Sequence, residues 1–206
     1  MRDNIEILTS AAAAHREGLR SVGRRRFIGQ SALLAAGFAI AGGLPVPSLV
    51  QGMQPSSPNA DLGILNTALG LEHEGIAAYQ IAAESGLLQA PVLAVGILFQ
   101  GHHKGHRDEL ARLILMAGGR PVEPRSQAEY AHAINAAALK SQEDILRLAV
   151  KLERGAANAY IGSIAALHDF KLAQLFARLG ADEAAHWTVL TNAIGEAIPK
   201  QALIFG

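Results

Sequence analysis

The stretch Asp182-Glu183-Ala184-Ala185-His186 places a carboxylate and an imidazole three residues apart. Side chains at that spacing lie on the same face of an α-helix. Apolar residues before and after the stretch recur at steps of three and four on this face: Leu172, Leu175, Leu179, Leu190 and Ala193. Such a recurrence is typical of an amphipathic helix. The sequence therefore predicts a helix whose buried face carries two ionisable groups.

Three earlier segments repeat this pattern. Their apolar faces comprise, in chain order, Leu62, Leu65, Leu69, Glu72, Ile76 and Tyr79; Val92, Val95, Phe99, His103, His106, Leu110 and Leu113; and Leu146, Ala149, Glu153, Ala156, Tyr160, Ser163 and Leu167. Each segment has Glu or His near its middle, and no alternation typical of a β-strand competes with the helical period. An aromatic content of only 5% also favours helices packed through small residues. We therefore predict an all-α four-helix bundle.

Turn signals separate the four predicted helices. Glycine and proline break the chain at residues 86–91 and 118–121, and the third helix meets the fourth near residues 168–169. Asn59 or Asp61 is placed to cap the first helix. Residues 119–139 form a long crossover between the second and third helices, and residues 126–138 within it are themselves predicted to be helical.

Glu and His on buried faces need a partner, because an unpaired charge is costly to remove from water. A bound cation is the simplest shared partner. The chain has no cysteine, so imidazoles and carboxylates must supply the ligands. The candidate ligands are Glu72, His103, His106, Glu153, Glu183 and His186.

Other residues compete for two of these positions. Glu74 lies two residues after Glu72 and therefore on another face of the helix. His102 or Glu109 can turn inward instead of His103, since each lies one helical step from His106. The simpler alternative is that the candidate Glu and His side chains face solvent and bind no metal.

The chain also contains an internal repeat. Glu72 is followed by Tyr79 and Glu153 by Tyr160, both at a spacing of seven, while His103 and His106 match Glu183 and His186. The repeat predicts two helical hairpins related by a pseudo-twofold axis, with a site on that axis. The two tyrosines are core aromatics or, alternatively, donate hydrogen bonds to a ligand carboxylate on a neighbouring helix.

These residues resemble the ferritin-like superfamily, and in particular bacterioferritin- and rubrerythrin-type di-metal bundles, which use Glu from two helices and Glu-x-x-His from the other two. The resemblance implies that Glu72 and Glu153 are terminal ligands, that Glu183 bridges two metals, and that His106 and His186 bind one metal each. His103 departs from the pattern, because it stands where the family has a second bridging Glu. The metal implied is iron or manganese, with zinc as the alternative.

The first 53 residues are predicted to be an export signal and linker, and residues 54–206 the bundle domain. The run Arg24-Arg25-Arg26-Phe27-Ile28 precedes an apolar stretch over residues 31–43 and resembles a twin-arginine export signal. The expected location is periplasmic or extracellular, reached through the twin-arginine export machinery. A membrane-tethered form is the alternative if the signal is not cleaved.

Taken together, the sequence predicts an exported metal-binding protein that handles iron or oxidants. The family resemblance implies ferroxidase- or peroxidase-like chemistry with oxygen or peroxide. Two alternatives stay open: a non-catalytic structural or stress-related bundle with a single structural metal, and a degenerate bundle in which Glu and His pair without metal. The balance of 18 basic and 18 acidic side chains argues against a nucleic-acid partner. The surface patches that would decide homo-oligomer formation are not evident in the sequence.

Overall fold

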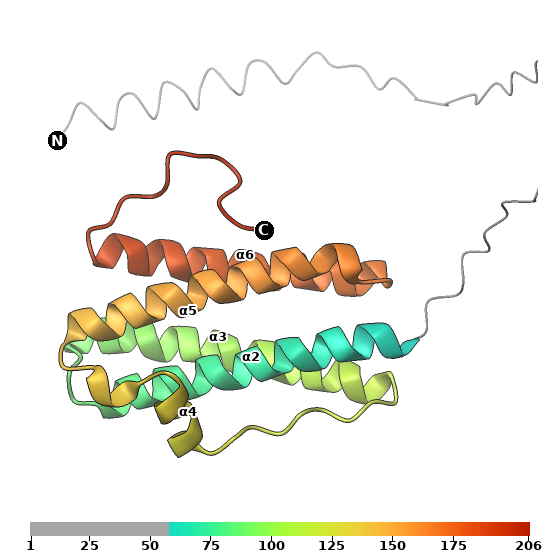
Figure 1. Cartoon of the computed structure of the whole chain (residues 1–206), viewed down its shortest axis with the longest axis horizontal. Coiled ribbons are helices and arrows are strands. Elements are labelled where there is room, and N and C mark those ends of the chain that lie inside the picture. Colours follow the sequence, from blue (N-terminus) through green and yellow to red (C-terminus); the bar gives the residue numbers. More distant parts are fainter. Residues whose placement is uncertain (1–57) are drawn as a thin grey trace, which may run out of the picture. The chain divides into compact units, whose positions relative to one another are not determined.

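The computed structural model describes residues 58–206, and helices are the only regular secondary structure in this range (Figure 1). Four long helices dominate: α2 (Pro58–Glu84), α3 (Ala90–Met116), α5 (Gln142–Ser163) and α6 (Phe170–Ala193). A short helix, α4 (Gln127–Ala133), and two single 3₁₀ turns lie in the connections. Helix α2 packs against α3, α5 packs against α6, and the two hairpins meet along α2 and α5. The predicted all-α four-helix bundle is confirmed.

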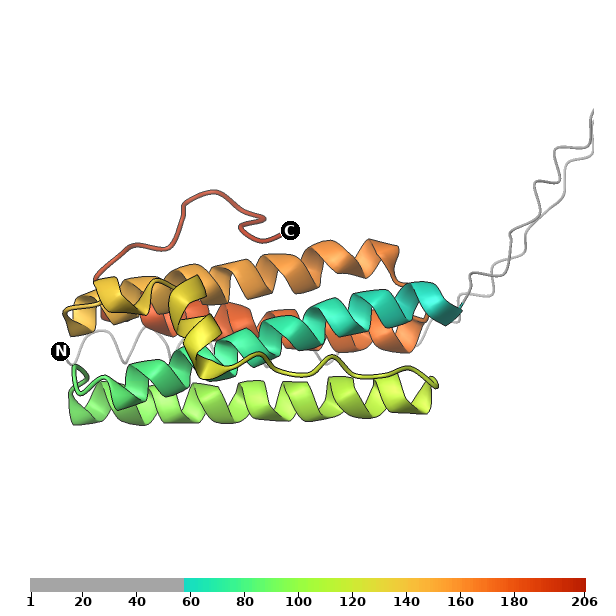
Figure 2. The same cartoon turned by 60° about the horizontal axis from the view of Figure 1, so that its bottom comes forward.

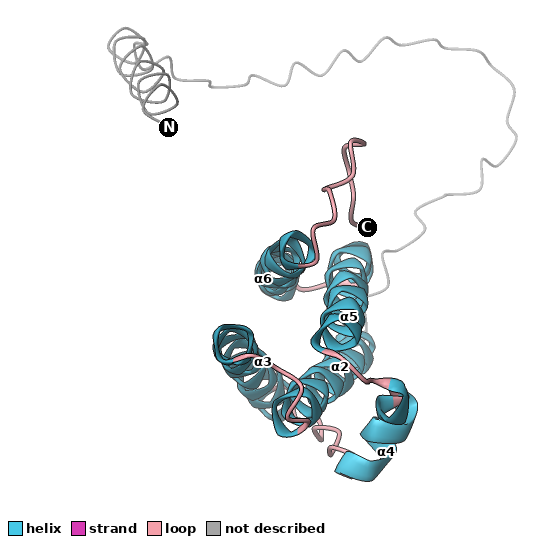
Figure 3. Ribbon diagram, turned by 90° about the vertical axis from the view of Figure 1, so that its left-hand side faces the viewer, coloured by secondary structure: helices cyan, strands magenta, loops and turns pink. Residues whose placement is uncertain are grey.

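The long crossover is also present. Figure 2 shows the chain leaving the end of α3 and running back along the bundle to α4, which packs against α2 outside the four long helices (Figure 3). Ser126 caps α4 and forms a reciprocal capping box with Glu129, which explains why a helix starts here. The helix expected within residues 126–138 is therefore found at Gln127–Ala133, followed by a 3₁₀ turn at Ala136–Ala138.

Side-chain caps fix the starts of the second hairpin's helices. The Ser141 hydroxyl accepts a hydrogen bond from the backbone N–H of Asp144 at the start of α5, and Asp169 accepts one from Lys171 at the start of α6. Asp61 acts differently from the expected cap of α2. Its carboxylate accepts hydrogen bonds from the backbone N–H groups of His168 and Asp169, both at 3.1 Å, and so ties α2 to the α5–α6 joint.

Two apolar clusters fill the interior, one toward each end of the bundle. The larger contains Leu65, Leu69, Leu110, Ile114, Tyr160, Phe176 and Leu179. The smaller contains Phe99, Leu146 and Leu190, with partly buried side chains of α2, α3 and α5 packed against it. The six candidate ligands form a buried polar layer between these clusters. Phe176 belongs to the larger cluster although it was not among the positions expected to face inward.

Within the described residues, none of the helices has the length and apolar character needed to cross a membrane. The predicted export signal, and the domain boundary at residue 53, lie outside the described residues.

Candidate metal centre

All four long helices contribute to one buried cluster of ionisable side chains. Helix α2 supplies Glu72, α3 supplies His103 and His106, α5 supplies Glu153, and α6 supplies Glu183 and His186. Each of the six is at most 8% exposed, although charged residues are rarely buried so completely. The structure thus brings together every residue that the sequence singled out as a candidate ligand.

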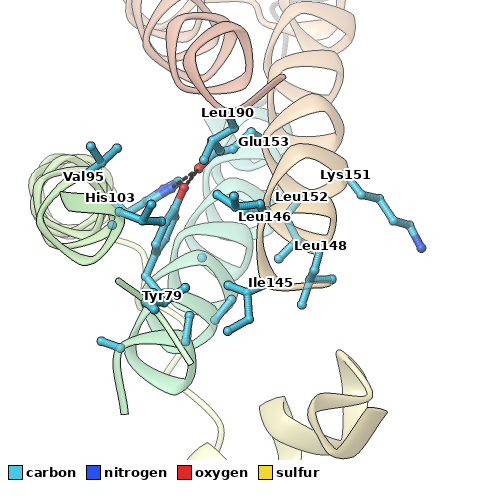
Figure 4. Close-up of a pocket in the computed structure, with 18 of the residues that line it drawn as sticks. Tyr79, Val95, His103, Ile145, Leu146, Leu148, Lys151, Leu152, Glu153 and Leu190 are labelled. Carbon is cyan, nitrogen blue, oxygen red and sulfur yellow. Dashed lines mark hydrogen bonds and ion pairs between the residues drawn. The ribbon is translucent and has the colours of Figure 1, made fainter. Parts of the chain in front are cut away.

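The imidazole of His103 lies between carboxylates of both hairpins. Its Nδ1 is 2.8 Å from Glu72 Oε2 and 3.7 Å from Glu183 Oε1, whereas its Nε2 is 3.2 Å from Glu153 Oε1. Figure 4 shows this ring pointing at Glu153 beside the hydroxyl of Tyr79. Nδ1 therefore faces Glu72 and Glu183, and Nε2 faces Glu153.

Glu183 occupies the matching position on α6. Its Oε1 is 3.1 Å from His106 Nδ1, and its Oε2 is 3.2 Å from His186 Nδ1. His186 Nδ1 is also 3.3 Å from Glu153 Oε2. The two oxygens of a single carboxylate thus face imidazoles from two different helices.

Two atoms at the centre of the cluster lack a hydrogen-bond partner among the described residues: His106 Nδ1 and Glu183 Oε1. They lie 3.1 Å apart, but their mutual orientation is not that of a hydrogen bond. A buried polar atom without a partner is costly, so such atoms call for a specific explanation. An imidazole nitrogen and a carboxylate oxygen that converge in this way are suitable donors for one cation.

The two tyrosines cross between the hairpins. Tyr79 on α2 donates a hydrogen bond to Glu153 Oε1 on α5 at 2.5 Å, and Tyr160 on α5 donates one to Glu72 Oε1 on α2. Burial, together with the carboxylates nearby, raises the pKa of both phenols, so they remain protonated donors. Each hydroxyl therefore fixes the orientation of one carboxylate.

Two further residues act from the surface, and the sequence did not reveal their roles. Asp182 Oδ2 lies 3.2 Å from His106 Nε2, and His102 Nδ1 lies 2.9 Å from His186 Nε2. Each residue immediately precedes a member of the cluster and reaches across to the opposite helix. Partners of this kind hold a ligand imidazole in one orientation. The only sequence signal was their position next to His103 and Glu183.

The alternative candidates lie outside the cluster. Glu109 forms hydrogen bonds with Arg112 on the surface of α3. Glu74 faces Arg125 at 4.0 Å. His102 is exposed and contacts the cluster only through His186.

The charges of the cluster are coupled. Burial disfavours the charged imidazolium of His106, but Glu183 and Glu72 outweigh this effect and raise its pKa to about 10. The pKa of His103 is likewise raised, because Glu153 and Glu72 outweigh its burial. Burial would raise the pKa of Glu153, yet His103 and His186 lower it. Without metal, protonated imidazoles therefore compensate the carboxylates of Glu72 and Glu153, whereas burial raises the pKa of Glu183.

The donor atoms form two sets of four, each compact enough to hold one ion. The first set comprises Glu72, His103, His106 and Glu183; the second comprises His103, Glu153, Glu183 and His186. His103 and Glu183 belong to both sets. Mixed imidazole and carboxylate donors suit iron, manganese and zinc. The residues present therefore fit a buried metal site.

Comparison with known proteins agrees with this architecture. A family model described as a ferritin-like domain matches residues 60–196. Among solved structures, the chain is similar to a conserved hypothetical protein, Rv2844, from Mycobacterium tuberculosis, with 20% identity and a TM-score of 0.57 over 70% of this chain and 97% of that chain. This likeness concerns the fold. None of the curated proteins compared with the chain matches it. Because the family model extends from the start of α2 to beyond the end of α6, the chain belongs to the family of proteins with a ferritin-like domain.

Proposed function

We propose that the buried cluster binds two divalent metal ions, iron or manganese, and that the protein handles iron or oxidants. The observation that carries this proposal is the convergence of two unpartnered buried atoms, His106 Nδ1 and Glu183 Oε1, inside two overlapping sets of four donors. Glu72 and His106 would belong to one ion, and Glu153 and His186 to the other. Glu183 would serve both, since one of its oxygens faces His106 and the other faces His186. His103 would be a ligand of one ion only, because a neutral imidazole has a single free ring nitrogen.

Bound iron or manganese would supply redox chemistry toward oxygen or peroxide. The chain's own residues would orient the ligands. Tyr79 and Tyr160 each hold one carboxylate through a hydrogen bond from the opposite hairpin. Asp182 and His102 contact the outer nitrogens of His106 and His186, so the inner nitrogens face the carboxylates.

A second candidate function is a non-catalytic bundle with one structural metal, such as zinc, or with none. The contacts of His103 favour it, because this ring already pairs with Glu72 and Glu153 without a cation. Three carboxylates also balance two divalent cations less completely than four would.

Thermal unfolding of the full chain tests metal binding. The protein is stripped with a chelator, and Fe(II), Mn(II) or Zn(II) is then added without oxygen. A ligand that binds only the folded state raises the midpoint temperature of unfolding. At a free metal concentration of 100 times Kd, the free energy of unfolding rises by about 2.7 kcal/mol. We expect this rise in the wild type and in Glu143→Gln, an exposed change on the same helix as Glu153. Glu153→Gln should lose it.

Equal midpoints with and without every metal would overturn the proposal. Oxygen uptake on adding Fe(II) then separates the two candidate functions. Uptake that is lost in Glu153→Gln supports oxidant handling, and stabilisation without uptake supports a structural metal.

We also propose that the chain is exported through the twin-arginine machinery, on the strength of Arg24, Arg25 and Phe27 and the apolar stretch after them. In a bacterial host with that pathway, the wild type should reach the periplasm. The double change Arg24→Lys and Arg25→Lys should leave the protein in the cytoplasm, and equal export of both would contradict the proposal.

A further inference from the structure

A cavity of about 540 Å³ opens beside the candidate metal centre, between α2, α3, α5 and α6 (Figure 4). Most of its lining is aliphatic and consists of Leu, Val, Ile, Ala, Gly and Pro residues. Tyr79, His103 and Glu153 line the cavity where it meets the cluster, and Glu74 and Lys151 are the other charged residues of its lining. Lys151 points away from the cavity in Figure 4. Two candidate ligands are thus also part of the cavity wall.

The cavity is elongated along the bundle. On α2 its lining runs from Leu71 to Ala83, and on α5 from Ile145 to Ala156. At 1.5 Å per residue, the twelve steps along α2 correspond to about 18 Å. Binding pockets for small molecules commonly have volumes of 300–1,000 Å³, mostly apolar walls and a few polar groups. The dimensions and lining therefore fit a long, thin, apolar molecule.

The internal repeat explains why this space is open. Positions on α2 match those 81 residues later on α5, and positions on α3 match those 80 residues later on α6. Gly96 on the cavity wall corresponds to Phe176, whose ring packs edge-on against Tyr160 in the larger apolar cluster. A Cβ added at Gly96 would meet the ring of Tyr79 at 3.6 Å. The cavity therefore lies where the other half of the bundle has an aromatic side chain.

Two more cavity positions are smaller than their counterparts. Ala83 matches Ile164, and Ala193 matches Leu113. Both counterparts pack against the larger apolar cluster, whereas both alanines line the cavity. The opposite end of the α2–α5 groove has a smaller pocket of about 400 Å³, lined in part by Phe176 and by no Glu or His. Of these two pockets, only the larger reaches the ionisable cluster.

We propose that this cavity binds a long unbranched aliphatic molecule, with one end of the chain against Tyr79, His103 and Glu153. Tyr79 and the His103 imidazole, both at the cluster end, are the aromatic rings of the lining, which favours an aliphatic chain over a planar ring system along the remaining walls. A role for this molecule as a substrate would rest on the proposed metal centre, which it would adjoin. Its binding does not, because the cavity walls need no metal.

The test uses the full chain in the presence of a chelator, with cis-parinaric acid, a fluorescent long-chain fatty acid, as the probe. Binding should raise its fluorescence, and saturated fatty acids and alcohols of increasing length should displace it. Each methylene that enters the cavity should tighten competition about fourfold, until the space is filled. If the competing affinity does not change with chain length, the proposal is overturned.

Gly96→Phe places at this position the ring that its counterpart Phe176 has, and it should weaken probe binding at least tenfold. The matched control is Gly101→Phe on the same helix, where the added side chain is exposed and meets nothing within 4 Å. The control should bind as the wild type does. Equal affinity of the two variants would overturn the assignment to this cavity.

If circular dichroism shows that Gly96→Phe does not fold, the double change Ala83→Ile and Ala193→Leu takes its place. This variant should also weaken probe binding, because both larger side chains enter the cavity. Failure of the probe to bind a chain that still takes up metal would overturn only this inference. Binding of the probe to a chain that takes up no metal would overturn only the proposed function.

Discussion

His103 determines the charge of the cluster. It stands where the ferritin-like pattern has a bridging Glu, and it presents one ring nitrogen to Glu72 and the other to Glu153. An imidazolium there compensates the carboxylates without metal. A carboxylate there would need a cation instead, because buried like charges repel.

We therefore predict that His103→Glu makes folding depend on metal. Breaking a buried ion pair commonly costs 3–5 kcal/mol, so the chelated variant should lose about 3 kcal/mol of unfolding free energy. Added Mn(II) should restore more stability to this variant than to the wild type. Urea unfolding with and without Mn(II) measures both, and a chelated variant as stable as the wild type would refute this account of His103.

The tyrosines give a second prediction at single residues. Tyr160→Phe removes the only hydroxyl that donates from α5 to Glu72, so a buried carboxylate loses a hydrogen bond. We expect a loss of about 2 kcal/mol and weaker metal retention during dialysis. Tyr130→Phe is the control, since its hydroxyl contacts the backbone of Arg125 outside the cluster. Equal metal retention in the two variants would show that Tyr160 has no part in holding the site.

At the level of the helices, the period of three and four was sufficient to predict the bundle and its polar layer. Glu72 and Glu183 face inward because their helices bury that face, which follows from spacing alone. The contacts of Asp182 and His102 could not be predicted, because they depend on how far α6 lies from α3. The same holds for Phe176, since a small rotation of a helix decides which flanking residue enters the core.

Asp61 provides a prediction about the joints between helices. Its carboxylate accepts from two backbone N–H groups at the start of α6 and from the His168 ring. Asp61→Ala should therefore lower the free energy of unfolding by about 2 kcal/mol, as measured with urea. Asp108→Ala, at an exposed position on α3, is the control. Identical midpoints would mean that the tie between α2 and the α5–α6 joint contributes nothing.

For the whole molecule, the coupled charges predict how stability depends on pH without metal. A His whose folded pKa exceeds its unfolded value stabilises the fold at low pH and loses that contribution as pH rises. For His106, this stabilising contribution declines between pH 6.5 and about pH 10. Glu153 behaves oppositely, because its pKa is lowered from 4.5, and its contribution disappears as pH falls below that value.

The chelated chain should therefore be most stable between about pH 4.5 and pH 6.5 and should weaken steadily toward pH 10. Urea midpoints across this range measure the effect. His106→Gln should flatten the decline on the alkaline side. Midpoints that rise from pH 7 to pH 10 in the wild type would contradict the charge assignment.

The most direct test of the central claim is elemental analysis of the full chain, purified without added metal. It is compared with the double variant Glu153→Gln and Glu183→Gln and with the exposed control Glu143→Gln. The proposed site predicts about two iron or manganese ions per chain in the wild type and the control, and loss of both in the double variant. No metal in any of the three proteins, or the same content in all, would contradict it.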